Sequence, residues 1–72
     1  MAHKNLASER HRLGMSQTEL AEELHVSLSS IGKWEKDIST MPMEVVKKAA
    51  SFFGCSVDYL ADRTEERLPR VS

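Results

Sequence analysis

The apolar residues between positions 17 and 36 fall into two sets at helical spacing, with a break between them. The first set is Leu20, Ala21 and Leu24, and the second is Ile31 and Trp34. Residues three and four apart share one face of a helix, so each set predicts a short helix with one buried side. Ser27 stands in the break and is a favoured N-cap residue, which places the start of the second helix at Leu28. The pattern therefore predicts two short helices, 17–24 and 28–36, joined by a tight turn.

Caps and glycines predict three further helices, over residues 4–13, 43–53 and 57–62. Gly14 and Gly54 follow the first and fourth helices, as glycine commonly does at helix ends. Ser16 and Glu19 have the spacing of a capping box before the second helix. On the first helix we expect three residues to share the inward side; they are Leu6, Arg10 and Leu13. The prediction is an all-α fold of five helices, with a loop over 37–42.

The last residues of the chain are polar apart from Leu68 and Val71. We therefore expect a domain over residues 1–63 and a polar tail over 64–72. A turn or two of the tail can continue the fifth helix before Pro69, and the end is expected to fray.

The two helices at 17–24 and 28–36, with their flanks, resemble the lambda-repressor-like (XRE, Cro/CI-type) helix-turn-helix family over roughly residues 4 to 62. One departure is His25, where the family usually has Gly. The turn often needs a left-handed residue there, which His adopts less easily than Gly. The resemblance implies a five-helix domain whose 28–36 helix enters the DNA major groove. It also implies a sequence-specific transcriptional regulator, most often a repressor of phage, mobile-element or bacterial promoters.

Four residues on the outward face of the 28–36 helix are candidates for reading bases: Leu28, Ser29, Gly32 and Lys33. Three of them match positions from which family members touch base edges. Lys33 can donate to guanine, Ser29 can donate or accept, and Leu28 can pack on a thymine methyl group. Gly32 either allows close approach to the DNA or is a neutral choice.

Candidates for phosphate contact lie around this face. Gln17 opens the 17–24 helix, where a side-chain amide and free N–H groups suit a phosphate oxygen. The resemblance implies that Gln17 also braces a side chain of the recognition helix. The other candidates are Ser30, Lys36, Ser39 and Thr40, with Asn5 and Arg12 as weaker ones. Each alone could equally be a solvated surface residue.

Arg10 and Glu35 match a partly buried ion pair of several family members, which implies a structural tie between the first and third helices.

Helix 43–53 carries more apolar residues than one face needs. Either it is central and packed nearly all round, or part of it forms a patch for a partner subunit. The resemblance implies a homodimer on a double-stranded DNA operator. The candidate dimer residues, chosen for this apolar surplus, are Val45, Phe52 and Tyr59.

The charge balance leaves a rival open. The chain has 10 Lys and Arg against 11 Asp and Glu, a net charge of −1, although phosphate attraction supplies most non-specific DNA affinity. We therefore expect weak non-specific binding. The rival is a helical protein-interaction module, such as an antitoxin or anti-repressor component, with weak or no DNA binding.

Other functions find little support in the sequence. The histidines at 3, 11 and 25 have no metal-ligand spacing with each other or with Cys55, and no glycine-rich phosphate loop is present. We therefore expect no enzyme activity, cofactor, metal or small-molecule substrate. With one cysteine and no apolar run long enough for a membrane span, we expect a reduced cytoplasmic protein.

Overall fold

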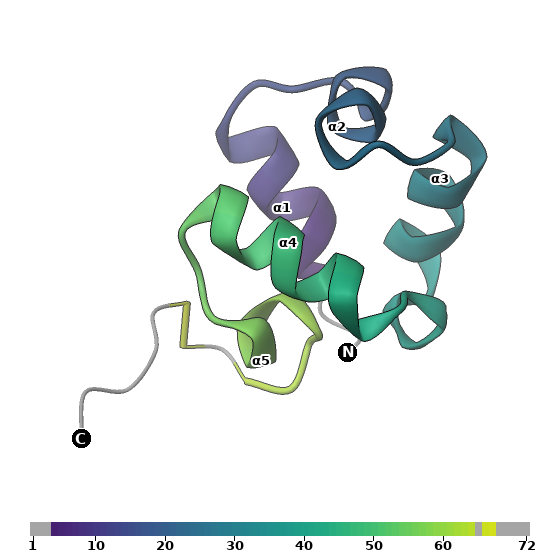
Figure 1. Ribbon diagram of the computed structural model, residues 1–72. Coiled ribbons are helices and arrows are strands. Elements are labelled where there is room, and N and C mark those ends of the chain that lie inside the picture. Colours follow the sequence, from purple (N-terminus) through teal and green to yellow (C-terminus); the bar gives the residue numbers. More distant parts are fainter. Residues whose placement is uncertain (1–3, 65, 68–72) are drawn as a thin grey trace.

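The computed structural model describes residues 4–64, 66 and 67 of the 72-residue chain, and these residues form helices and connections without a strand. The elements are α1 (Asn5–Arg12), α2 (Gln17–Leu24), α3 (Leu28–Lys36), the 3₁₀ turn η1 (Ile38–Thr40), α4 (Met43–Phe53) and α5 (Val57–Leu60). The predicted all-α fold with five α-helices is confirmed (Figure 1). The loop expected over 37–42 contains η1.

Serine caps determine where three helices begin. Ser16 Oγ accepts from the Glu19 N–H at 3.1 Å, and the Glu19 carboxylate accepts from the Ser16 N–H at 2.9 Å, which completes the predicted capping box. Ser27 and Ser56 cap α3 and α5 in the same way, each accepting an N–H bond from the residue three positions on. These side chains satisfy donors that a helix start leaves unpaired.

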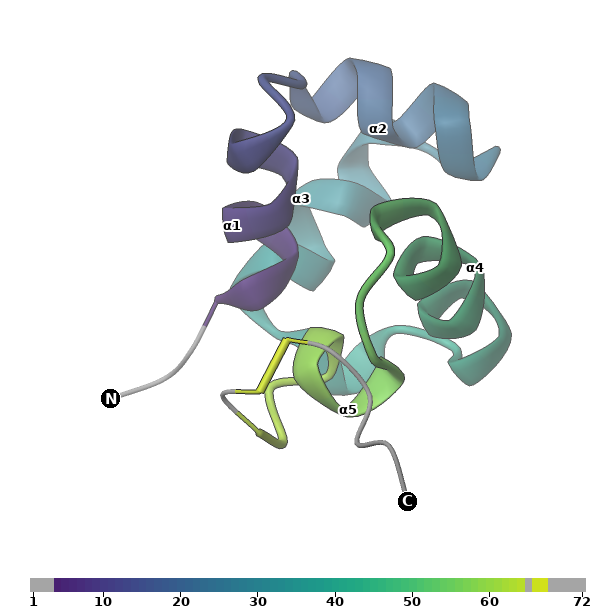
Figure 2. The same cartoon turned by 90° about the vertical axis from the view of Figure 1, so that its left-hand side faces the viewer.

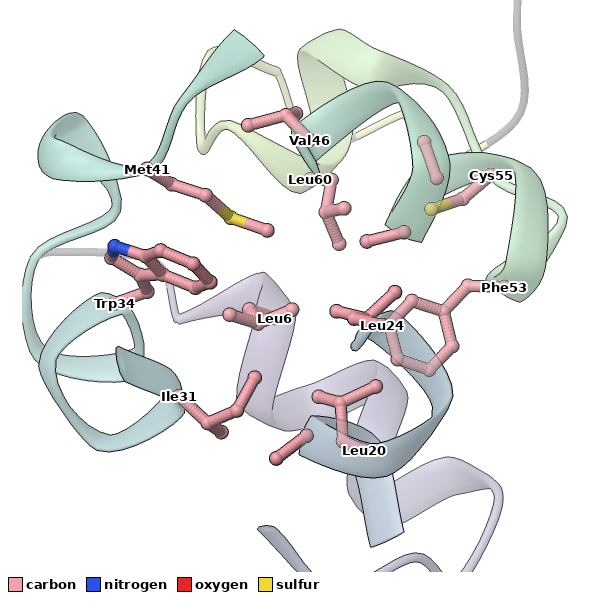
Figure 3. Close-up of a cluster of buried hydrophobic side chains, with 13 residues drawn as sticks. Leu6, Leu20, Leu24, Ile31, Trp34, Met41, Val46, Phe53, Cys55 and Leu60 are labelled. Atoms are coloured by element: carbon pink, nitrogen blue, oxygen red, sulfur yellow. The ribbon is translucent and has the colours of Figure 1, made fainter. Parts of the chain in front are cut away.

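The core lies where all five helices meet (Figure 3). α2 and α3 contribute the residues that the sequence predicts between them: Leu20, Ala21, Leu24, Ile31 and Trp34 are all buried. α1 supplies Leu6, and α4 and α5 cover the other side of the cluster. α2 and α5 lie at opposite ends of the domain, and α3 lies along one edge (Figures 1 and 2). The outer side of α3 is therefore left uncovered.

Two expectations about helix ends are wrong. α1 ends at Arg12, so Leu13 leaves the helical path and is 43% exposed, whereas Glu9 takes an inward position at 2%. α5 ends at Leu60, because Asp62 turns into the left-handed region at φ 62° and the Arg63 N–H bonds to Asp58 O at 2.8 Å. The described residues after Asp62 do not continue the helix. Leu68, Pro69 and Val71 lie outside the described residues, and the boundary between a 1–63 domain and a tail stays a prediction.

The turn between α2 and α3 needs a left-handed residue, and His25 supplies it at φ 58° and ψ 45°. The Val26 N–H then reaches Ala21 O at 3.0 Å and closes the helix end. A Cβ in this region costs about 1–2 kcal/mol. His25 is therefore a strained position in an otherwise regular turn.

We expect His25→Gly to be more stable than His25→Ala by about 1 kcal/mol, because glycine removes the Cβ clash but loses more backbone entropy. Urea unfolding of both variants checks this. Glu23, exposed within α2, is the matched control position, because there Ala should be the more stable by about 0.5–1 kcal/mol. If the Ala variant were the more stable at position 25 as well as at position 23, the result would contradict a strained turn.

Candidate nucleic-acid interface

The outer face of α3 carries the four residues predicted to read bases. Leu28 is 50% exposed, Ser29 and Lys33 are exposed, and Gly32 is partly exposed. On the opposite face Ile31 is fully buried. The face offers one apolar side chain, one hydroxyl and one ammonium group, with a glycine between them.

The start of this face is ordered by three serines. Ser27 Oγ lies 3.2 Å from Ser29 Oγ and 2.8 Å from Ser30 Oγ. A hydroxyl has one proton and two lone pairs, so Ser29 and Ser30 each keep capacity for a further partner. Ser27 Oγ also accepts from the Ser30 N–H at 3.2 Å and is fully used. Ser29 and Ser30 are thus held at the first turn of α3, which is the end that should reach base edges and phosphates.

A hydrogen-bonded network behind this face joins α1, α2 and α3. Arg10 Nε donates to Glu35 Oε2 at 2.7 Å, and Arg10 Nη2 donates to Glu35 Oε1 at 3.1 Å. Gln17 Nε2 donates to Glu35 Oε1 at 3.0 Å, and Arg10 Nη1 reaches Met15 O at 2.9 Å. The Arg10 and Glu35 side chains are only 11% and 9% exposed. The network fixes α3 relative to the first residue of α2.

The Glu35 carboxylate stays charged in this network. Burial alone would raise its pKa, but hydrogen bonds from Arg10 and Gln17, with the Arg10 charge, outweigh burial and lower the pKa below 4.5. For Glu9, too, burial would raise the pKa, but hydrogen bonds from Arg67 and Arg12 and the charges of these arginines lower it. Both carboxylates are therefore bound in their ionised form.

Acid should weaken the fold through these two groups. A carboxyl whose pKa is lowered on folding stabilises the protein above its unfolded pKa, and this contribution is lost as pH falls through the folded pKa. We expect Tm to be nearly constant from pH 7 to about 5 and to fall below the ordinary carboxyl value of 4.5. Thermal melts of wild type and Glu35→Gln over this pH range check this. The variant should have a lower Tm at neutral pH, and its Tm should fall less steeply in acid. An equal fall of Tm in acid for the two proteins would contradict the expectation.

The loop after α3 has a feature that sequence reasoning missed. Ser39 donates its N–H and its hydroxyl to Asp37 Oδ1, at 3.1 and 2.5 Å, and the Thr40 hydroxyl donates to Asp37 O at 3.1 Å. These bonds from Ser39 are the main cause of a lowered Asp37 pKa. Phosphate contact from Ser39 or Thr40 stays a prediction. It would require the Ser39 donors to turn away from the Asp37 carboxylate, or the Thr40 hydroxyl to turn away from the Asp37 carbonyl oxygen. Lys36, at the end of α3, is exposed.

The three candidate dimer residues are not equally accessible. Phe52 is 39% exposed, with its ring 5.2 Å from that of Phe53, whereas Val45 and Tyr59 are partly buried against the core. Met43, which lies on the same helix as Phe52, is 44% exposed. Nine positions separate Met43 from Phe52, about two and a half turns, so these two side chains lie on opposite sides of α4 and do not form one patch.

Asn5 is a wrong candidate for phosphate, because it is buried. Its N–H donates to Asp62 Oδ1 at 3.1 Å and its Nδ2 donates to Tyr59 O at 2.7 Å. Asp62 thereby supplies the cap that α1 lacks locally, since the Lys4 side chain makes no capping bond. Asn5 ties the start of α1 to the end of α5.

Arg12 belongs to a second network that the sequence did not reveal. Its guanidinium donates to Glu9 Oε1 at 3.0 Å and to Phe53 O at 3.1 Å, and Arg67 donates to the same two groups. The Glu9–Arg12 spacing of three is a signal that could have suggested half of this network. Arg67 lies 58 residues from Glu9, and no local pattern connects them.

Among the residues that the structure describes, no cluster of three or more His, Cys, Asp or Glu side chains could hold a metal ion. His3 lies outside them. Burial raises the pKa of the Cys55 thiol. No helix within the described part of the chain is long and apolar enough to cross a membrane.

Comparison with known proteins agrees with this geometry. A family model described as helix-turn-helix matches residues 6–60, which is most of the chain. Searches among curated proteins and among solved structures returned no match.

Proposed function

Because the chain belongs to the lambda-repressor-like helix-turn-helix family, we propose that it is a sequence-specific DNA-binding transcriptional regulator that acts as a repressor. It would repress by occupying a promoter, without catalysing a reaction. Phage, mobile-element and bacterial promoters are the proposed targets. The observation that carries the proposal is the uncovered outer face of α3.

This face has the composition of a reading surface. Leu28 is an apolar side chain left half exposed at the first turn, where a thymine methyl group can pack on it. Lys33 lies one turn after Ser29 and suits the acceptors of guanine. Leucine has no hydrogen-bonding group and a serine hydroxyl is poorly suited to a bidentate contact, so water-mediated contacts and DNA shape should add to specificity.

The network behind the face supports a fixed docking angle. Gln17 is the first residue of α2 and is bonded to Glu35 of α3, so a phosphate held at the start of α2 would have a defined position relative to α3. Gln17 Nε2 has a second hydrogen that can be donated to such a phosphate oxygen. Lys36 would hold a further phosphate from the other end of α3.

The rival function, a protein-interaction module, is favoured by the net charge of −1 and by the exposed apolar residues Met43 and Phe52. Exposed glutamates on α2 add to it; these are Glu19, Glu22 and Glu23. Such negative charges weaken the attraction to DNA of any sequence. Under the proposed function, contacts with the correct bases would therefore supply most of the affinity.

A salt titration separates the two functions. Fluorescence anisotropy would be measured with the protein on a promoter fragment taken from upstream of its own coding region and on a scrambled duplex. The proposal expects tighter binding to the promoter fragment and a linear fall of log affinity with log salt on both. Equal and salt-insensitive binding to the two duplexes would favour the interaction module.

We further propose that the protein binds DNA as a homodimer and is at most a weak dimer when free. An operator with two related half-sites about one helical turn apart would match two copies related by a two-fold axis. The contact would use α4 and α5, through Phe52 with Val45 and Tyr59 at its edge. The exposed Phe52 ring is the central element of this patch.

Phe52→Ser should shift the free protein toward monomer and weaken cooperative binding to a two-half-site duplex. Analytical ultracentrifugation at micromolar and near-millimolar concentration measures the first effect. Leu13→Ser is the matched control, because Leu13 is similarly exposed, at 43%, but lies at the end of α1. A strict monomer that also protects a single half-site would contradict the proposed dimer.

A further inference from the structure

Residues 66 and 67 fold back onto the helical body after α5 has ended. The Ser56 N–H donates to Arg67 O at 2.8 Å, so this segment returns to the cap of α5. Arg67 Nη2 donates to Phe53 O at 2.7 Å, at the end of α4. We refer to residues 66 and 67 as the C-terminal latch.

The latch closes on a buried carboxylate of α1. The Glu9 side chain is 3% exposed, and Arg67 Nε lies 3.0 and 3.1 Å from its two oxygens, with Arg67 Nη2 at 2.9 Å from Oε1. Arg12, three residues from Glu9 on the same helix, donates to Oε1 at 3.1 and 3.0 Å. Glu9 therefore has one local arginine and one distant arginine.

Pairing with two arginines lowers the free energy needed to detach the C-terminal latch from Glu9. A buried carboxylate that loses its only partner destabilises a fold strongly. When Arg67 leaves, however, Glu9 keeps Arg12, so the open state contains no unpaired buried charge. The described residues from 63 onward contribute no buried apolar side chain, which leaves polar contacts to hold the latch. Segments with few buried apolar contacts open at lower free energy than the core.

We propose that the C-terminal latch opens and closes on Glu9 and the end of α4 while the five helices stay folded. The proposal goes beyond DNA binding, because it gives residues 66 and 67 two arrangements relative to one folded domain. Arg67 is the moving partner of Glu9, and Arg12 is the partner that remains. Opening would release Ser56 N–H and Phe53 O from Arg67 at the same time.

Native-state hydrogen exchange of the Ser56 amide, followed by NMR on the full 72-residue chain, tests the proposal directly. In wild type the Ser56 amide should exchange at least tenfold faster than that of Leu24, which is buried in α2. Its rate should not respond to low concentrations of urea. Arg67→Ala should raise the Ser56 rate a further tenfold or more and leave Leu24 within about twofold. Arg63→Ala is the matched control, because the Arg63 side chain is 63% exposed and pairs only with Asp58 among the described residues, at 3.7 Å.

The Arg12→Ala variant provides a second, opposite readout. With Arg12 absent, opening would strand Glu9, so the Ser56 amide should exchange more slowly relative to Leu24 than in wild type. The proposal is overturned if the Ser56 amide exchanges at the same rate as the Leu24 amide and its rate has the same dependence on urea. It is equally overturned if Arg67→Ala leaves the Ser56 rate unchanged, or if Arg12→Ala and Arg67→Ala both speed it.

Discussion

Replacing Arg10 by Met, or Glu35 by Gln, should each destabilise the protein by about 3 kcal/mol. The guanidinium and the carboxylate form two hydrogen bonds with each other, and both side chains are about nine-tenths buried. Removing either group leaves the other charge poorly solvated. The Arg10 variant also frees the Met15 carbonyl, and the Glu35 variant weakens the Gln17 contact.

The apolar double replacement Arg10→Met with Glu35→Leu should recover much of the loss, because it buries no unpaired charge. For a domain of this size each kcal/mol moves Tm by about 4–8 °C, so the single variants should melt ten degrees or more below wild type. Thermal unfolding followed by circular dichroism measures this. Arg63→Met, in an exposed ion pair, is the control and should stay within about 0.5 kcal/mol. Single variants that melt within a degree or so of wild type would contradict a structural role for the pair.

Lys33→Ala should reduce discrimination between operator and random DNA, whereas Lys36→Ala should reduce affinity for both. Lys33 lies on the exposed face one turn after Ser29, which should place it in the groove. Its loss should cost about 1–3 kcal/mol on the operator and much less on random duplex. Lys36 is the last residue of α3, beside the loop, where a phosphate contact is expected.

The salt dependence separates the two roles. Lys36→Ala should lower the slope of log affinity against log salt by about one phosphate contact on both duplexes. Ser29→Ala should behave like Lys33→Ala with a smaller effect. Titration of each variant on operator and scrambled duplex provides the comparison. An unchanged specificity ratio in Lys33→Ala would show that α3 does not read the DNA through this residue.

The helices and their order were predictable because the signals are local. Apolar spacing, serine caps and the glycine at position 54 act within one or two turns, and the structure uses them as expected. Leu13 was mispredicted because extending the pattern by one turn assumed that the helix continued past Arg12. A periodic pattern indicates a face but not where the helix ends.

The polar networks were only partly predictable. The resemblance to a family suggested Arg10 and Glu35, and the structure brings them together. Nothing local distinguishes the buried Glu9 from a surface glutamate, since its second partner, Arg67, is 58 residues away. Asp37 could have been recognised, because an acidic residue two positions before Ser39 commonly accepts from its N–H.

Selection of duplexes from a random-sequence library by the purified protein tests the central proposal most directly. DNA reading by α3 predicts enrichment of a motif with two related half-sites centred about ten base pairs apart. It also predicts that Lys33→Ala, shown to be folded by its melting curve, loses preference at one position in each half-site. A folded wild-type protein that enriches no motif over the starting library would contradict sequence-specific DNA binding.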